Sequence, residues 1–339
     1  MKEKFTEFFR KYKLVFLGLL IIVLAFLPSI LKKAFLIRHA CNILMYATLA
    51  GSLNIINGYS GQVCMGQAGF FAIGAYVNAV LSSRYGVSFW FLLPICGLSA
   101  ALAGYLVSLP TRRLQGIYLS IVTMGAAEII RVIALTWEPV TGGSNGIKGI
   151  PYPVLFGEEI FKPKNYYYFF LVLAIVFLFV TNRVLKSRVG RAWISIREDQ
   201  IAARSLGVET NRYKSLNFMY GAFWAGVVGC VYAPFVNYID SSQFTLDRGF
   251  DVLAMVVIGG QGTLAGPIVG STIVTILTET LRSLENWRYV IYACLIITMM
   301  WLRPQGIAGA SNSILAGGKI RRKEEDTAKG GKIGGKVNG

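Results

Sequence analysis

The chain has 339 residues, of which 54% are hydrophobic and only 15% are charged, and its formal net charge is +17. A soluble globular domain carries about 25% charged residues, so this composition excludes that class. The basic residues form short clusters between apolar runs rather than one folded face, which argues against a nucleic-acid-binding protein. The apolar runs have the length of about 20 residues that a helix needs to cross a bilayer, so the sequence predicts an all-α polytopic membrane protein.

Ten apolar segments are predicted to be transmembrane helices, some of them broken by glycine. In chain order they cover residues 14–31, 39–57, 62–83, 89–109, 117–136, 166–182, 216–238, 249–259, 263–281 and 287–302. The shortest is 249–259, which at about 1.5 Å per residue reaches only about half of a 30 Å core. This segment is either half of a broken helix or a full passage, so the expected number of spans is eight to ten.

The positions of the Lys and Arg residues predict which side of the membrane each loop faces. If the N-terminus is cytoplasmic and all ten segments cross, 23 basic residues fall inside and 10 fall outside. Both termini are therefore expected to be cytoplasmic. The chain then divides into a basic N-terminus (1–13), a transmembrane domain (14–302) with a cytoplasmic loop at 186–215, and a basic tail (303–339) that is expected to be disordered.

Two of the apolar segments are interrupted by glycine, one in each half of the chain. They read Asn57-Gly-Tyr-Ser-Gly-Gln-Val-Cys-Met-Gly-Gln-Ala-Gly69, continuing to Gly74, and Gly259-Gly-Gln-Gly-Thr-Leu-Ala-Gly-Pro-Ile-Val-Gly270. Such pairs indicate a substrate path, because unwound backbone can present N–H and C=O groups to a solute. Close helix packing is the alternative, since small residues let helices approach in lipid. The candidate path residues are Gly58, Gly61, Gln62, Gly66, Gln67, Gly69, Gly74, Gly259, Gly260, Gly262 and Thr263.

Glu128 and Arg131 are one helical turn apart in the segment 117–136 and are expected to pair. Charge inside a membrane is costly and often functional, but near a span end the side chains can reach water. We therefore expect a structural pair near the end of this span. His39 is the only histidine, so no histidine-based catalytic dyad, metal site or enzyme active site is predicted.

The richest polar segment is the predicted cytoplasmic loop between the sixth and seventh spans. Helix formers run from Ala192 to Leu206, and Gly207 stands where a helix C-cap is expected. Glu198 and Asp199 lie near the middle of this predicted helix, with arginines on both sides. A short helix presented to the cytoplasm suits docking to a soluble partner. The alternative is a solvated loop that only follows the positive-inside rule.

Four motifs, in order along the chain, resemble one family. The run from Gly58 to Tyr76 matches G-Y-x-G-Q-x-x-x-G-x-A-x-F-F-x-I-G-A-Y, residues 141–147 match T-G-G-x-x-G-I, and residues 259–270 match G-G-x-G-T-x-x-G-P-x-x-G. The loop G-R-A-W-I-S-I-R-E-D-Q-I-A-A-R-S-L-G-V, from Gly190 to Val208, is similar to the coupling segment of permease subunits in bacterial ABC importers. Over residues 40–305 the chain resembles the branched-chain amino acid permeases of these importers, of the LivM type.

The resemblance implies a transport subunit of a bacterial plasma (inner) membrane. It would pair with a second, homologous permease, two cytosolic ATPases and an extracytoplasmic binding protein, with membrane lipid around it and no nucleic acid. The ATPases would use ATP and magnesium, whereas this chain would hold no cofactor and hydrolyse no ATP. Branched-chain or related amino acids are the implied solutes. A permease for urea or short amides is the first alternative, and an ion-coupled secondary transporter is the second.

The resemblance also implies roles for two further sets of residues. ATPase coupling is implied for Gly190, Arg191, Arg197, Glu198, Asp199, Ala202, Ala203 and Gly207. The loop on the side of the binding protein would use Gly142, Gly143, Asn145 and Gly146.

Overall fold

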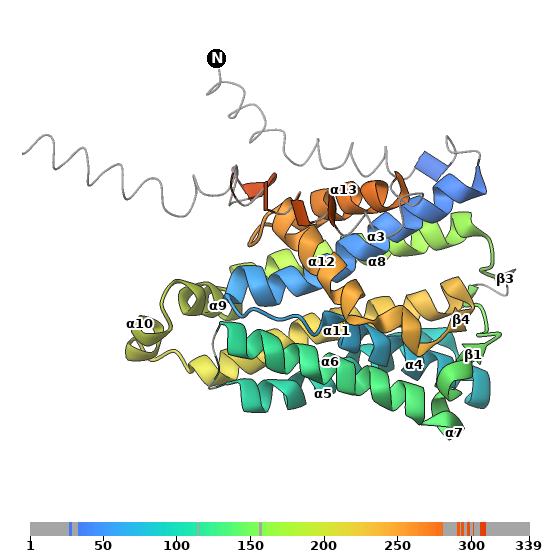
Figure 1. Cartoon of the computed structure of the whole chain (residues 1–339), viewed down its shortest axis with the longest axis horizontal. Helices are drawn as coiled ribbons and strands as arrows, with labels where there is room; N and C mark the ends of the chain where they lie inside the picture. Colours follow the sequence, from blue (N-terminus) through green and yellow to red (C-terminus); the bar gives the residue numbers. More distant parts are fainter. Residues whose placement is uncertain are drawn as a thin grey trace, which may run out of the picture.

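The computed structural model describes residues 27–28, 33–112, 114, 116–155, 158–280, 290–291, 293–294, 297–298, 301 and 306–309. The predicted spans 14–31 and 287–302 lie mostly outside these residues, as do the N-terminus 1–13 and most of the tail 303–339. The described chain is a bundle of α-helices with two short two-stranded sheets (Figure 1).

The helices follow the apolar segments. They are α3 (Ala34–Asn54), α4 (Gln67–Tyr85), α5 (Phe89–Thr111), α6 (Ile117–Thr136), α7 (Glu138–Thr141), α8 (Pro163–Lys186), α9 (Arg188–Glu198), α10 (Gln200–Ser205), α11 (Thr210–Val236), α12 (Leu246–Gly259) and α13 (Gly266–Thr280). A π-helix, η1 (Ile55–Tyr59), continues α3, and the 3₁₀ turns η2 (Gly143–Asn145) and η3 (Ser241–Phe244) lie in loops. Strand β1 (Ile147–Lys148) pairs antiparallel with β4 (Tyr238–Ile239), and β2 (Val154–Leu155) with β3 (Glu158–Glu159).

Within the described residues, four helices, α5, α6, α8 and α11, are long and apolar enough to cross a membrane by length and composition. They match the predicted spans 89–109, 117–136, 166–182 and 216–238 and support an all-α membrane protein. Helix α12 has only 14 residues, about 21 Å, and the chain then turns at Gly260 toward α13. The predicted segment 249–259 is thus one arm of a broken pair, and ten full spans stay a prediction.

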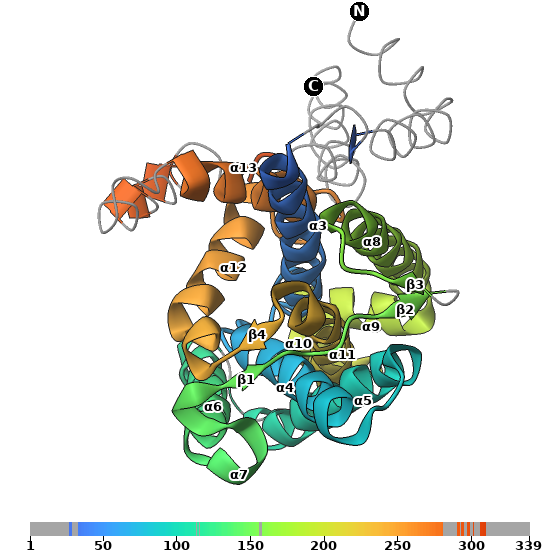
Figure 2. The same ribbon diagram turned by 90° about the vertical axis from the view of Figure 1, so that its right-hand side faces the viewer.

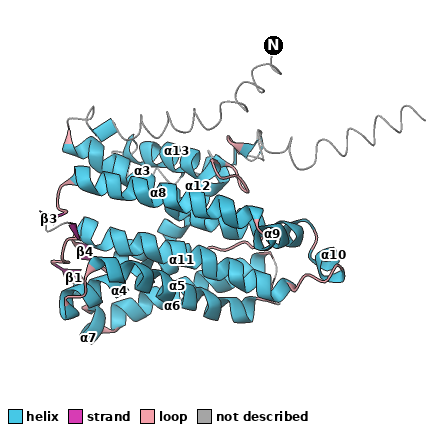
Figure 3. Ribbon diagram, turned by 180° about the vertical axis from the view of Figure 1, so that it is seen from behind, coloured by secondary structure: helices cyan, strands magenta, loops and turns pink. Residues whose placement is uncertain are grey.

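The loops gather at two opposite ends of the bundle, with the strands confined to one of them (Figures 1 and 3). One end, which we call the α10 end, carries α9, α10 and the turn between α5 and α6. The other, the β4 end, carries α7 and the two sheets. Side chains fix both ends: Arg112 donates to Ser215 Oγ at 2.9 Å at the α10 end, and Arg84 donates to the Val140 carbonyl at 2.9 Å at the β4 end. Loops predicted to share a membrane face therefore lie together.

Helix α11 lies near the centre of the bundle, packed on α3, α4, α5 and α9 (Figure 2). It approaches α4 closely at a point where small residues of the two helices face one another. A Cβ atom on Gly74 of α4 would overlap the carbonyl oxygen of Gly226 in α11, and one on Gly229 would overlap the carbonyl oxygen of Phe71. Glycine at these positions brings the two backbones into contact, which is the main way that helices associate in lipid.

Candidate functional site

The two glycine-broken segments, far apart in sequence, lie side by side at the α10 end. Asn54, the last residue of α3 and 1% exposed, holds them together. Its Nδ2 donates to the carbonyl oxygen of Thr263 at 2.8 Å, and its Oδ1 accepts from the backbone N–H of Gly262 at 2.9 Å. A Cβ atom on Gly58 would overlap both the Asn54 side chain and the backbone nitrogen of Gly262. The contact therefore requires glycine at position 58.

The first of these segments leaves α-helical geometry twice. Residues Ile55–Tyr59 form a π-helix, and residues 61–66 are non-helical until α4 begins at Gln67 (Figure 1). Gly61 has a φ of 69°, a left-handed conformation that glycine adopts without steric cost. The predicted helix over 62–83 is thus wrong for its first five residues. Irregular backbone at membrane depth is tolerated only where it is buried in protein or lines a cavity.

Polar groups of neighbouring elements satisfy the irregular backbone. The side chain of Asn57 bridges to Cys64, accepting from its N–H at 3.0 Å and donating to its carbonyl at 3.2 Å. The backbone N–H of Met65 donates to Thr123 Oγ1 of α6 at 3.1 Å. These bonds fix the segment against α6 and explain how it persists inside an apolar bundle.

Both glutamines predicted for the path are buried and engaged inside the protein. Gln62 donates to Ser60 Oγ at 2.8 Å and to Asn217 Oδ1 of α11 at 3.3 Å. Gln67 donates to Ser52 Oγ at 2.6 Å, while its Oε1 has no hydrogen-bond partner among the described residues. In this state neither amide faces a solute, so a role in the path requires the segment to open.

The other predicted path residues lie at close contacts between elements. A Cβ atom on Gly66 would meet Thr123 of α6, and one on Gly69 would meet Ala127 of α6. A Cβ atom on Gly74 would meet Gly226, and one on Gly259 would meet Gly266. Gly260 lies against Gly266 and Gly306, and Thr263 Oγ1 accepts from the Gly266 N–H at 3.0 Å. Close packing thus accounts for these positions. Whether the same residues also line a solute path stays a prediction.

The polar loop forms two short helices, α9 and α10, instead of the single helix predicted from Ala192 to Leu206. Asp199 separates them with an extended backbone (φ −157°, ψ 113°). Its Oδ1 accepts from the N–H groups of Ile201 and Ala202 at 2.8 and 3.0 Å, so it caps the N-terminus of α10. Glu198 and Asp199 therefore lie at a break and not in mid-helix, because a capping bond competes with continued helix. Gly207, at φ 84°, follows the end of α10 as expected.

Helix α9 is amphipathic and lies against the end of the bundle. Its buried face includes Gly190, which packs on the Leu185 backbone of α8, and Trp193, whose Nε1 donates to the Tyr213 carbonyl at 3.0 Å. Helix α10 buries Ala203, is joined to α11 by the hydrogen bond from Lys214 Nζ to Gln200 Oε1 at 2.8 Å, and projects from the end of the molecule (Figure 1). Two large apolar side chains here are open to solvent: Ile201 of α10 is 81% exposed, and Leu206, which follows its last residue, is 85% exposed.

Arg197, in the last turn of α9, connects this loop to both glycine segments. Its Nη1 donates to the carbonyl oxygen of Gly58. Its guanidinium also lies so close to Gly262 that a Cβ atom there would overlap Nη1, and its Cγ would be 3.2 Å from a Cβ atom on Gly61. Arg191, by contrast, donates to the Lys186 carbonyl at 3.1 Å, within its own loop. One arginine thus joins the three segments that the sequence singled out.

The residues predicted for the binding-protein side form a tight turn at the opposite, β4 end. Thr141 Oγ1 donates to the Ala134 carbonyl at 2.7 Å, and the backbone N–H of Asn145 donates to the Gly142 carbonyl at 3.1 Å. Gly143 is buried, and a Cβ atom on Gly146 would overlap the Ile239 carbonyl of β4. The turn and the α9–α10 segment therefore lie at opposite ends of the bundle.

The Glu128–Arg131 pair forms as predicted, but its position differs. Arg131 Nε donates to both carboxylate oxygens of Glu128, at 2.9 and 3.0 Å. Glu128 is the twelfth of the 20 residues of α6, so the pair lies near the middle of the helix and not near its end. The side chains of Arg131 and Glu128 are still 24% and 36% exposed.

Comparison with known proteins gives one consistent result. Residues 35–300 match the family described as branched-chain amino acid transport system / permease component. The chain is 37% identical over 320 residues to the high-affinity branched-chain amino acid transport system permease protein LivM of Escherichia coli (strain K12), covering 88% of this chain and 75% of that protein. It is 24% identical over 285 residues to the permease protein LivH of the same strain, covering 78% and 91%. No solved structure matches the chain.

Proposed function

The chain belongs to the family of permease components of branched-chain amino acid transport systems, and from this premise we propose that it imports branched-chain or related amino acids as one subunit of an ATP-driven transporter. It is a multi-pass inner-membrane protein with no expected catalytic role of its own. The proposed partners are a second permease of the same family, two cytosolic ATPases that use ATP and magnesium, and an extracytoplasmic binding protein.

The observation that carries the proposal is the junction at Arg197. An ATPase that moves α9 would displace the hydrogen bond to Gly58 and the contact with Gly262 together. Both glycine segments would then shift as one unit, held by Asn54. Coupling of this kind requires that the conformations before and after this movement differ in their contacts with the ATPase and the binding protein. A ligand shifts an equilibrium between two conformations only if it binds one of them more tightly.

Helix α10 is the proposed contact for the ATPase. Ile201 of α10 and Leu206, which follows its last residue, are apolar and exposed, so covering them with a partner surface would remove apolar area from water. Association would bury both side chains and push on α9 through Asp199. The tight turn at 141–147, at the other end, is the proposed contact for the binding protein.

The function is tested by uptake into membrane vesicles that contain this chain with its partner permease and ATPases. Leucine uptake is expected to require ATP and to persist when the proton gradient is collapsed. Uptake that follows the proton gradient and ignores ATP would establish the secondary-transporter alternative instead. Valine and isoleucine are expected to compete with leucine uptake, whereas urea and acetamide are not. If urea and acetamide compete and the two amino acids do not, the chain is an amide permease.

Both termini are proposed to be cytoplasmic, which places the α10 end inside. Gln261 is an exposed residue in the turn between α12 and α13 at this end. In a background without the exposed Cys294, a Gln261→Cys variant is expected to react with an impermeant maleimide only from the cytoplasmic side. Ser144→Cys, at the β4 end, is the matched control and is expected to react only from outside. If Gln261→Cys reacts only from outside and Ser144→Cys only from the cytoplasm, the orientation is the reverse of the one proposed.

A further inference from the structure

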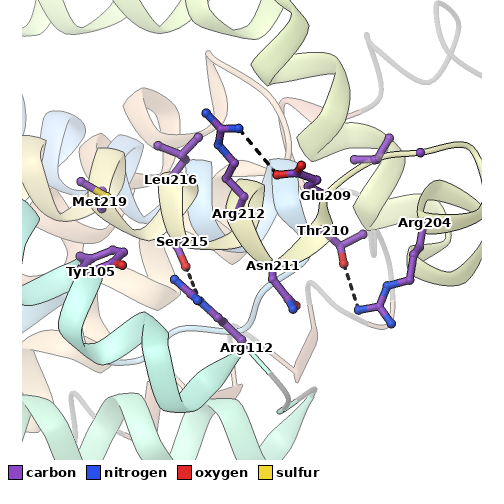
Figure 4. Close-up of a pocket in the computed structure, with 12 residues that line it drawn as sticks. Tyr105, Arg112, Arg204, Glu209, Thr210, Asn211, Arg212, Ser215, Leu216 and Met219 are labelled. Carbon is purple, nitrogen blue, oxygen red and sulfur yellow. Dashed lines mark hydrogen bonds and ion pairs between the residues drawn. The ribbon is translucent and has the colours of Figure 1, made fainter.

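A pocket of about 710 Å³ opens at the α10 end, outside the junction described above. It lies between the end of α5, the start of α11 and the loop that follows α10 (Figure 4). None of its polar residues takes part in the contacts between the glycine segments and Arg197. The pocket is therefore separate from that junction, although Arg204 and Gly207 at its edge belong to the segment proposed to contact the ATPase.

The charge of the pocket is strongly positive. Arg112 after α5, Arg204 in α10 and Arg212 in α11 all line it, and Glu209 is its one acidic lining residue. Glu209 is already paired with Arg212, Nη1 to Oε2, at 3.6 Å. Two guanidinium groups from different elements are thus left without a carboxylate among the lining residues.

These two guanidinium groups retain donors for a ligand. Arg112 Nε donates to Ser215 Oγ at 2.9 Å, and Arg204 Nη2 donates to Thr210 Oγ1 at 3.4 Å. A guanidinium has five N–H donors in a fork that matches phosphate oxygens. Figure 4 shows the Asn211 amide between the two arginines, so a further polar group faces the same space.

The opposite wall of the pocket is apolar and continues along the bundle. Tyr105, Leu216 and Met219 form it, and Tyr105 is 37% exposed. Leu102 and Leu106, on the same side of α5, are 60% and 56% exposed and extend this apolar surface toward the middle of the helix. The site is therefore basic where α5 leaves the membrane and apolar where α5 runs through it.

We propose that this pocket binds one anionic phospholipid, whose phosphate lies between Arg112 and Arg204 and whose acyl chains follow the exposed face of α5. Basic pockets between transmembrane helices at the membrane surface have this ligand preference. An acidic peptide or a nucleotide would satisfy the arginines but leave the apolar wall uncovered. Bound lipid would bridge α5 and α10 and so steady the loop from Gly207 to Thr210 next to the proposed ATPase contact.

The experiment is a lipid-retention measurement on the purified transporter, by native mass spectrometry, with phosphatidylglycerol or phosphatidylcholine added in equal amounts. The wild-type protein is expected to retain phosphatidylglycerol preferentially. The double variant Arg112→Gln/Arg204→Gln is expected to lose this preference by about tenfold or more. The matched control, Arg183→Gln/Arg188→Gln, removes the same charge from exposed arginines at the same end outside the pocket and is expected to behave as wild type.

Three results would overturn the proposal. Unchanged retention in the pocket variant would show that the two arginines do not hold the lipid, and an equal loss in the control would mean that only net charge matters. Displacement of phosphatidylglycerol by millimolar inorganic phosphate would identify a soluble phosphate as the ligand. If the glutamine variant does not fold, Arg112→Lys/Arg204→Lys keeps the charge but loses the planar fork, and an intermediate retention is expected. None of these outcomes depends on transport.

Discussion

Replacing Arg197 with glutamine is expected to lower amino acid uptake by about tenfold or more while ATP hydrolysis by the assembled transporter continues. The substitution removes a charge-assisted hydrogen bond to the Gly58 carbonyl, and bonds of this type contribute about 1.5–3 kcal/mol. It also removes the guanidinium that lies beside Gly262. Movement of α9 would then no longer be transmitted to the glycine segments, so hydrolysis and transport would separate.

The measurement is ATP-dependent uptake and the rate of ATP hydrolysis in the same vesicles. Arg188→Gln is the matched control, because Arg188 is an exposed arginine in the first turn of the same helix. Glu198 and Asp199 are less suitable positions, since Asp199 caps α10 and its loss would disturb the loop itself. Normal uptake in the Arg197 variant, with normal amounts of protein in the membrane, would show that α9 does not act through this arginine.

Replacing Gly74 with leucine is expected to prevent most of the chain from folding. Any side chain at this position overlaps the backbone of Gly226, so α4 and α11 must separate where their backbones are in contact. Overpacking against side chains costs about 1–3 kcal/mol, and backbone cannot move aside as a side chain does. Against a total stability of about 5–15 kcal/mol, the expected loss exceeds that of an ordinary core substitution.

The measurement is fluorescence-detected size-exclusion chromatography of the solubilised protein. The midpoint of its thermal unfolding is then determined. The matched control is Gly125→Leu in α6, because a Cβ atom there meets no other atom within 4 Å. This control is expected to give wild-type amounts of protein. A Gly74 variant with a wild-type elution profile and midpoint would mean that the two helices are not packed as described.

The four spans that α5, α6, α8 and α11 match were predictable because the signal for them is local. A bilayer requires a long apolar helix whatever its neighbours are, and the expected segment 117–136 coincides with α6. The Glu128–Arg131 pair was predictable for the same reason, since it depends only on helical spacing. The alternation of the loops between two ends follows from the spans themselves.

The breaks in the helices were not predictable from composition. The residues from Ala192 to Leu206 favour one helix, and only the capping bonds of Asp199 divide it. The π-helix at Ile55–Tyr59 and the irregular residues 61–66 depend on partners from α6, α11 and the second glycine segment. Asn54 was missed altogether, although a polar residue at the end of an apolar run is a signal that could have drawn attention to it.

The ion pair in the middle of α6 restricts the surroundings of this helix in the assembled transporter. A charged side chain at the centre of a bilayer costs about 2.5–3.5 kcal/mol on insertion scales, and mutual pairing leaves 36% of the Glu128 side chain uncovered. Acyl chains cannot solvate that carboxylate. The side of α6 that carries Glu128 and Arg131 is therefore expected to face water or another protein surface rather than lipid, which restricts how this subunit can be oriented beside a partner.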